Sequence, residues 1–348
     1  MSANESKLAA SKSPLRMKKD NHILTIIALM LLVCIIMLIL KPGSYFTVLN
    51  VRSMIFQFPE YGVLALGMMA CMIAGGIDLS LVGIMNLSGV LAALIVKNMV
   101  LIEGGEVANP AMVVPAIVLA CVVAVVVGAA CGAFNGFIIG YFGLPAMLVT
   151  LCGLQLYTGL AYGITGGPAI NGMCDAFKNI ANGTVVGIPY VLFIFIAVVA
   201  VVVFIMKCTV FGHEIYFLGS NAQAAMYSGI NTLKVTIMTY MFSGILGGIS
   251  GILITSHLNS AKSSNGSTYT LLSLLIVVLG GVHPDGGKGR VAGVVLAVLL
   301  LQMIANAFGL MHMSDNAKTF ANGCLLIAAL VLSVVLEKRE AQKAAAAS

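Results

Sequence analysis

The feature that most constrains this fold is a run of about 20 apolar residues that recurs along nearly the whole chain. A helix needs about 20 apolar residues to cross a bilayer core, and a helix pairs its own backbone groups where no water can. Of the 348 residues, 60% are hydrophobic and 9% are charged, whereas soluble domains carry about 25% charged residues. Membrane β-barrels show weak alternating segments instead of long apolar runs. We therefore expect an all-α polytopic membrane protein.

The apolar runs predict about ten transmembrane helices in a single domain, residues 23–336, with some segments broken or re-entrant. The run at 269–281 is short for a full crossing and indicates a half-helix or a tilted segment. Polar tails precede and follow the domain at residues 1–22 and 337–348, and 207–234 is the largest loop. The predicted spans are 23–40, 53–74, 84–102, 111–140, 146–165, 188–206, 235–256, 269–281, 291–309 and 318–336.

The basic residues predict that both termini are cytoplasmic, because Lys and Arg concentrate on the inner side of a membrane. With the N-terminus inside, twelve basic residues fall on the inner side: Lys7, Lys12, Arg16, Lys18, Lys19, Lys207, Lys234, Lys288, Arg290, Lys338, Arg339 and Lys343. Five fall outside: Lys41, Arg52, Lys178, Lys262 and Lys318. The net charge of +6 is thus explained by basic residues that set the orientation of the chain in the membrane. KPGSYF follows the first run without a small-residue cleavage site, so we expect an uncleaved first span.

The small residues of the spans predict close helix packing. GAACGAFNGFIIG places Gly128, Gly132, Gly136 and Gly140 on one helix face, a small-xxx-small pattern that lets backbones approach closely. The eight cysteines and five histidines are scattered, with no CxxC pair. We therefore expect neither a disulfide framework nor a metal site.

Two ionisable residues lie near membrane depth, Glu60 and Asp78, where charge is costly and calls for a partner or a function. Asp78 stands in AGGIDLSLVG, after the helix-weakening pair Gly75-Gly76 and before Ser80. These residues predict a helix break, with Asp78 or Ser80 capping the next span. Broken helices survive in membranes where they are buried in protein or line a cavity. A capping role for Asp78 and a direct role in substrate passage both remain open.

Two further loops bear on energy coupling. The loop Leu279 to Gly293, LGGVHPDGGKGRVAG, imitates nucleotide motifs but has no GK[ST] and follows no strand, so we expect no ATP site on this chain. The loop 207–234 carries a small-residue helical patch, with Asn221 as a plausible N-cap and Gly229 as a plausible stop. Such a patch is either a surface connector or a knob that docks into a soluble partner.

Four stretches resemble the permease subunits of ribose-type ABC sugar importers, in that family's order over roughly residues 50–335. They are GGIDLSLVGIMNLSGVLAAL, LPAMLVTLCGLQLYTGLAYGITGG, FGHEIYFLGSNAQAAMYSGI and VVLGGVHPDGGKGRVAG. The chain departs from the pattern at His213, where the family usually has arginine, and at Ser220, which replaces a frequent glycine. The run Tyr269 to Ile276 lacks both acidic residues of the family's Y-E-L-D-A-I-A-A segment. This departure leaves open the exact substrate and whether the subunit pairs with a second copy of itself or with a sister permease.

The resemblance implies a type II-like importer permease of the bacterial inner membrane that forms a pathway for a monosaccharide or similar polar solute. It implies three partners: a second permease, identical or a sister, a cytoplasmic ATPase that holds ATP and Mg²⁺, and an extracytoplasmic binding protein. This chain itself would bind no cofactor and catalyse no reaction. The expected helix break near the pathway comprises Gly75, Gly76, Asp78, Ser80, Thr165, Gly166 and Gly167. The expected coupling helix comprises Gly219, Asn221, Ala224, Ala225, Ser228, Gly229 and Ile230.

The residues give less support to other functions than to an importer permease. A secondary transporter that uses Asp78 or Glu60 as an ion site would explain intramembrane carboxylates and interrupted helices, but it leaves the coupling-loop pattern unexplained. An ion channel would need a filter-like loop or a charged ring, and neither is visible in the sequence. Permeases for amino acids or nucleosides have related architectures, so the cargo is less fixed by the sequence than the mechanism.

Overall fold

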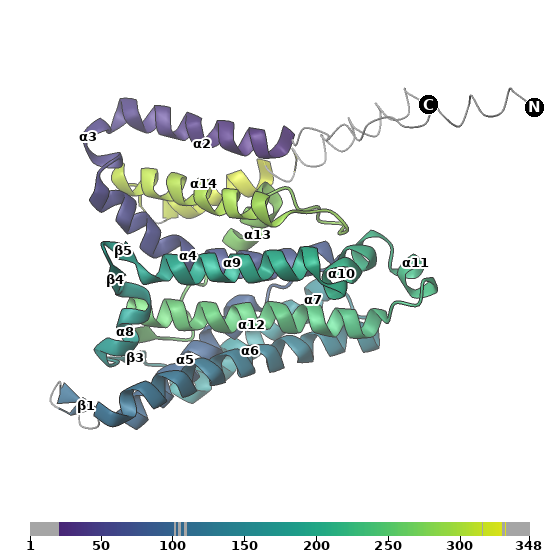
Figure 1. The fold of residues 1–348 in the computed structure, drawn as a ribbon, viewed down its shortest axis with the longest axis horizontal. Coiled ribbons are helices and arrows are strands. Elements are labelled where there is room, and N and C mark those ends of the chain that lie inside the picture. Colours follow the sequence, from purple (N-terminus) through teal and green to yellow (C-terminus); the bar gives the residue numbers. More distant parts are fainter. Residues whose placement is uncertain are drawn as a thin grey trace, which may run out of the picture.

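The structure is a computed structural model. It describes residues 21–100, 102–103, 106–107, 110–314, 316–328 and 331. The predicted tails at 1–22 and 337–348 lie almost entirely outside these residues. Within them the chain is a stack of helices that run along one long direction (Figure 1).

Eight helices of the described chain are long and apolar enough to cross a membrane. They are α2 (Asn21–Leu40), α4 (Val48–Ile73), α5 (Leu81–Val100), α6 (Val113–Phe142), α7 (Ala146–Thr165), α9 (Tyr190–Cys208), α12 (Thr232–Leu258) and α14 (Val291–Leu310). Each matches a predicted span to within a few residues. The short predicted segment is the 11-residue α13 (Tyr269–Leu279), and the helical residues 316–328 overlap the last predicted span, 318–336. The polytopic all-α prediction is confirmed.

Short elements connect the long helices and mark the two ends of the molecule. One end, called the α8 end, carries α3 (Pro42–Tyr45), the 3-10 helix η2 (Pro110–Met112), α8 (Asp175–Asn182) and three two-stranded antiparallel sheets. The sheets pair β1 (Ile102–Glu103) with β2 (Glu106–Val107), β3 (Ile170–Asn171) with β6 (Ser260–Ala261), and β4 (Thr184–Val185) with β5 (Ile188–Pro189). The opposite end, called the α11 end, carries α10 (Val210–Ser220) and α11 (Ala222–Tyr227) (Figure 1).

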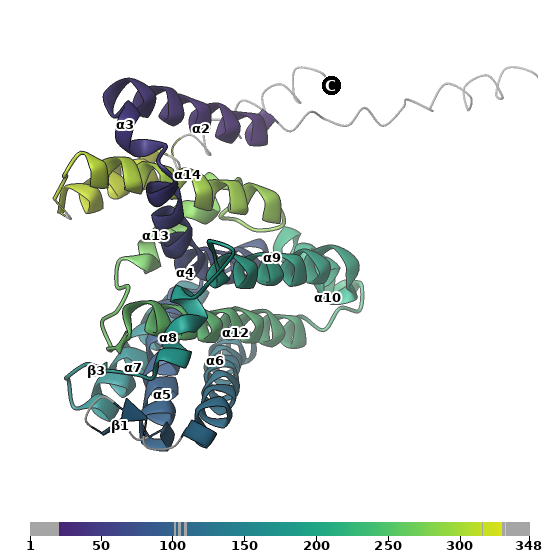
Figure 2. The same ribbon diagram turned by 60° about the vertical axis from the view of Figure 1, so that its left-hand side comes forward.

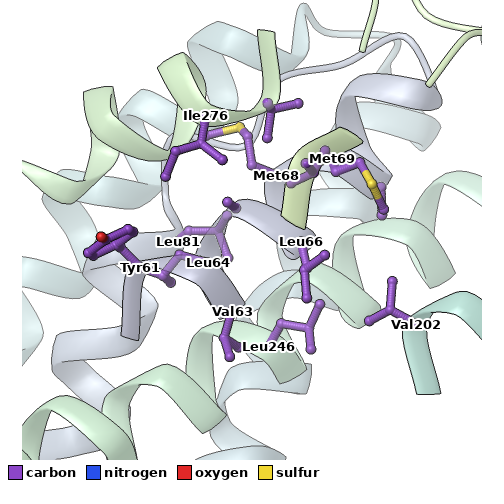
Figure 3. Packing of buried hydrophobic residues seen from close by; sticks show 14 of the residues in the cluster. Tyr61, Val63, Leu64, Leu66, Met68, Met69, Leu81, Val202, Leu246 and Ile276 are labelled. Carbon is purple, nitrogen blue, oxygen red and sulfur yellow. The ribbon is translucent and has the colours of Figure 1, made fainter. Parts of the chain in front are cut away.

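The core is organised around α4, whose second half is buried on every face, from Phe58 to Ile73. Met68, Met69 and Leu66 of this helix pack with Val202 of α9, Leu246 of α12 and Ile276 of α13 (Figure 3). A helix that is apolar all round is a buried one. By contrast α2 presents exposed apolar side chains such as Ile39 and Leu31. The inner helices thus bury α4, and the outer ones leave apolar faces for lipid or another subunit.

Glycines set the close packing of α6 against α12, as the sequence pattern predicts. A Cβ atom placed on Gly128 would overlap the backbone of Gly244, and one on Gly132 would overlap the carbonyl of Tyr240. The same holds for Gly248 of α12 against Ala124 of α6. The two helices therefore touch backbone to backbone, and this pair fixes where α12 presents its polar side chains.

Substituting Gly132 by alanine should lower stability, because its methyl group would have to displace backbone atoms of α12. Overpacking of this kind costs about 1–3 kcal/mol. Thermal unfolding of the detergent-solubilised protein measures the change. Gly163→Ala in α7 is the matched control, since no atom lies within 4 Å of its added Cβ, and alanine favours a helix over glycine. Equal melting temperatures for the two variants would contradict the backbone contact.

Candidate translocation and coupling site

The chain between α4 and α5 forms a short non-helical break, as the sequence predicts. Gly75 adopts φ +89°, a conformation that glycine tolerates best. The N–H of Gly76 donates to the Cys71 carbonyl at 3.0 Å, which closes the end of α4. The next carbonyl, that of Ile77, accepts a bond from the Thr150 hydroxyl of α7 at 2.9 Å. The break is therefore tied to a neighbouring helix.

Asp78 is completely buried at this break and is surrounded by hydrogen-bond donors. One carboxylate oxygen accepts from the Ser80 N–H at 3.1 Å and the Ser80 hydroxyl at 2.6 Å, and the other accepts from the Ser243 hydroxyl of α12 at 2.8 Å. Accepting the backbone N–H two residues on is an Asx-turn, the arrangement that leads the chain into α5. Asp78 thus organises the start of α5 through Ser80, one residue before the helix begins at Leu81.

A second layer of polar side chains extends this network to α6 and α7. The Asn135 amide of α6 donates to the Ser80 hydroxyl at 2.8 Å, and the Tyr157 hydroxyl of α7 donates to the Asn135 side-chain oxygen at 2.8 Å. With Ser243, the network joins the break to three helices. Sequence reasoning missed Asn135, Tyr157 and Ser243, although an amide inside an apolar run was a visible signal.

Glu60 forms a separate buried cluster within α4, at 2% exposure. Its carboxylate contacts the His257 ring of α12 and accepts from the Tyr269 hydroxyl of α13 at 3.2 Å. Its backbone carbonyl accepts from the Ser250 hydroxyl at 2.8 Å. Both intramembrane carboxylates therefore have polar partners, which accounts for their burial.

Three glycine-containing segments meet at the α11 end of the molecule. The Gly287 N–H donates to the carbonyl of Ile73, the last residue of α4, at 2.8 Å. A Cβ atom on Gly219 of α10 would overlap that same carbonyl, and Gly286 lies against Gly75 and Gly219. This glycine junction joins the helix break, α10 and the loop after α13 through backbone atoms. The sequence singled out Gly75 and Gly219 without showing that they touch.

A side-chain hydrogen bond reinforces the glycine junction. The Tyr216 hydroxyl of α10 donates to the Gly289 carbonyl at 2.9 Å. Burial raises the pKa of the Tyr216 phenol, and the nearby Arg290 offsets part of that rise. The phenol is therefore protonated at neutral pH and available as a donor. α10 is thus fixed to the loop 281–290 at two points.

The coupling helix that the sequence predicts between Gly219 and Ile230 forms parts of two helices, α10 and α11, which meet at Asn221. The Asn221 side chain accepts from the Ala224 N–H at 2.9 Å, which makes it the N-cap of α11, and the Ser228 hydroxyl donates to the Ala224 carbonyl at 2.9 Å. Gly229 at φ +84° ends the helix, and the Ile230 N–H donates to the Ala225 carbonyl at 3.1 Å.

The short helix α11 has a buried face and an exposed face. Ala225 is 2% exposed and anchors the helix, whereas Tyr227 is 85% and Met226 is 56% exposed. Exposed aromatic and methionine side chains are typical of interface residues. The outward face of α11, defined by Met226 and Tyr227, is therefore the part of this loop that is available to another subunit.

The other three candidate pathway residues lie far from the break. Thr165, Gly166 and Gly167 end α7 at the α8 end, with Gly166 at φ +68° and the Gly167 N–H donating to the Thr165 hydroxyl at 3.2 Å. Thr150, which contacts the break, precedes Thr165 by a helical rise of about 22 Å. The structure therefore brings Gly75, Gly76, Asp78 and Ser80 together and leaves this second set as a separate helix end.

A polar pocket of about 780 Å³ opens at the α8 end. Its walls come from the start of α4, from α8, and from the ends of α12 and α14. Arg52, Gln57, Asn182 and His257 contribute polar groups, and Phe56 contributes an aromatic ring over which the Arg52 guanidinium lies at 5.8 Å. A small polar solute needs such a mixture of amides, charge and aromatic surface. No single motif in the sequence pointed to this pocket.

The fold and these features define a multi-pass membrane permease. Residues 50–330 match a family described as "Branched-chain amino acid transport system / permease component". The ribose import permease RbsC of Haemophilus influenzae is 32% identical over 88% of this chain and 90% of its own. The L-arabinose permease AraH of Escherichia coli is 26% identical over 90% of both chains, and the autoinducer 2 permease LsrD of Photorhabdus temperata 30% over 81% of this chain and 83% of its own. No solved structure matches significantly.

The chain belongs to this family of transport-system permeases and is the permease subunit of an ABC importer. The family resemblance predicted from the four sequence stretches is confirmed. The self-sufficient secondary transporter has no support among these relatives, which are named as permeases of import or transport systems.

Replacing Asp78 by asparagine should be mild, and replacing it by leucine should be severe. Asparagine keeps an oxygen for the Ser80 donors, and its amide can donate to the Ser243 hydroxyl, which also accepts. Leucine leaves three buried donors without an acceptor, at about 1–3 kcal/mol for each unsatisfied group. Thermal unfolding and solute uptake together test this role. Loss of uptake in Asp78→Asn at unchanged melting temperature would instead show that transport needs the negative charge.

Proposed function

We propose that this permease imports a monosaccharide or a related small polar solute. The observation that carries the proposal is the extended similarity to permeases named for ribose, arabinose and autoinducer 2 import. The polar pocket at the α8 end supports it, because Arg52, Gln57 and the side-chain oxygen of Asn182 are polar groups of the kind that bind a polyol. The chain carries out no covalent chemistry in this proposal and binds no cofactor of its own.

The proposed energy source is a separate ATPase that docks at α10 and α11. The geometry supports this assignment: α11 presents Met226 and Tyr227 outward, while α10 is fixed by the glycine junction to the end of α4. A force applied to α11 would thus reach the break at Asp78 through backbone contacts. ATP and Mg²⁺ would be held entirely by the ATPase.

The proposed orientation places the α11 end in the cytoplasm of a bacterial inner membrane, with both termini on that side. The basic residues of the tails support it, since Lys and Arg stay inside. An extracytoplasmic binding protein would then deliver the solute at the α8 end. A second permease, identical or a sister, would complete the pathway against the exposed apolar helix faces.

Uptake in cells with and without this chain tests the cargo. We expect deletion to remove uptake of at least one labelled monosaccharide, with ribose and arabinose tried first, and to leave leucine uptake unchanged. Re-expression of the chain should restore the lost uptake. Loss of leucine uptake with normal monosaccharide uptake would overturn the sugar assignment in favour of an amino acid.

Substitution on the outward face of α11 tests the docking of the ATPase. Tyr227→Glu should reduce the amount of ATPase that co-purifies by about tenfold or more, because truncating an aromatic hot spot of an interface costs about 2 kcal/mol or more. The fold should persist, since the side chain is 85% exposed. Val186→Glu is the matched control, at 96% exposure at the α8 end. Unchanged ATPase recovery with Tyr227→Glu would contradict the assignment.

A further inference from the structure

A second cavity, of about 1010 Å³, lies between α9 and α14 near the α11 end. Ile23, at the start of α2, closes one side, and α10 closes the end through His213 and Tyr216. This groove is separate from the polar pocket at the α8 end and from the break at Asp78. Figure 2 shows α2, α14 and α9 as successive layers on this side of the molecule.

The walls of the groove are apolar along two membrane-spanning helices. Val199 and Val203 of α9 face it, and Val295 and Leu296 of α14 complete the wall. All four side chains are half-buried, so they leave apolar surface accessible inside the groove. Within the hydrocarbon core of a membrane, an accessible apolar surface of this kind is suited to bind a lipid acyl chain.

The mouth of the groove is basic. Lys207 at the end of α9, His213 on α10 and Arg290 just before α14 all line it and are exposed. None of the described lining residues is acidic. The other polar lining group is the Tyr216 hydroxyl, which is engaged with Gly289. An apolar channel with a basic mouth thus opens where the membrane-spanning helices end.

We propose that this groove binds one acidic phospholipid, with its phosphate at Lys207 and Arg290 and an acyl chain along Val199, Val203 and Val295. Basic pockets between transmembrane helices are the sites at which acidic lipid headgroups bind. A purely apolar occupant, such as a helix of a second copy, would match the apolar walls but not the basic side chains at the mouth. A free anion would leave the apolar walls uncovered. Only an amphiphilic anion matches both parts.

Such a lipid would also cover the contact that holds α10. Tyr216 and Gly289, which share the hydrogen bond at 2.9 Å, both line the groove. The bound lipid would exclude water from this hydrogen bond and press α10 against the loop before α14. The lipid is thus a structural ligand of the coupling region, and its binding does not depend on the identity of the transported solute.

Native mass spectrometry of the detergent-solubilised, full-length protein tests the proposal. The probes are phosphatidylglycerol and phosphatidylcholine with identical acyl chains. We expect the protein to prefer phosphatidylglycerol, and the Lys207→Gln/Arg290→Gln double variant to lose about 30-fold of that preference, the effect of two basic residues at a lipid surface. Lys178→Gln/Lys262→Gln, at the α8 end, should keep the wild-type preference. The charge-preserving Lys207→Arg/Arg290→Lys variant should keep it too and controls for folding.

A second variant tests the apolar walls. Val203→Trp should fill the groove and reduce retention of phosphatidylglycerol while leaving both basic residues in place. Full retention in Val203→Trp, or an equal loss in both glutamine double variants, would overturn the site. Competition by free glycerol phosphate at the affinity of the intact lipid would also overturn it, because the groove would then be a site for anions only.

Discussion

Every backbone polar group inside a membrane needs a partner within the protein, and the break between α4 and α5 is where this chain meets that requirement without a helix. Three partners do so: the Thr150 hydroxyl for the Ile77 carbonyl, the Asp78 carboxylate for the Ser80 N–H, and the Gly287 N–H for the Ile73 carbonyl. Thr150 and Gly287 come from distant parts of the chain, whereas Asp78 belongs to the break itself. The positions of α7 and of the loop before α14 are therefore linked to one interruption, and the Ser243 hydroxyl, which donates to the Asp78 carboxylate, links α12 to it as well.

The close approach of α6 and α12 depends on glycines, which have no side chain to hold the two backbones apart. Because Gly128 and Gly132 let α6 touch the backbone of α12, Ser243 on α12 comes close enough to donate to Asp78. Since α12 also carries Ser250 and His257 to Glu60, one helix supports both buried carboxylates. Packing and polar pairing are thus parts of one arrangement.

The sequence predicts the spans well because hydrophobic length is a local property, and the break because Gly75-Gly76 and Asp78 stand together in the chain. It also indicates the cap at Asn221 and the stop at Gly229, which are local signals as well. The Glu60–His257 pair joins residues 197 positions apart, and the glycine junction joins three segments that are distant in the sequence. Neither leaves a pattern in one sequence. For the same reason the sequence could not show that Thr165 to Gly167 lie at the opposite end of α7 from the break.

The glycine junction has a consequence for how this region can vary. The contacts of Gly219, Gly286 and Gly287 with the end of α4 and with Gly75 join a carbonyl, an N–H and bare α-carbons, so no side chain at these contacts can be exchanged to adjust their strength. Substitution of Gly219 or Gly287 can disrupt the glycine junction but cannot adjust its strength gradually. The pocket at the α8 end is built from side chains and is free to change. Under the proposed function, substitutions in that pocket change which solute is preferred and leave the proposed link to the ATPase unchanged.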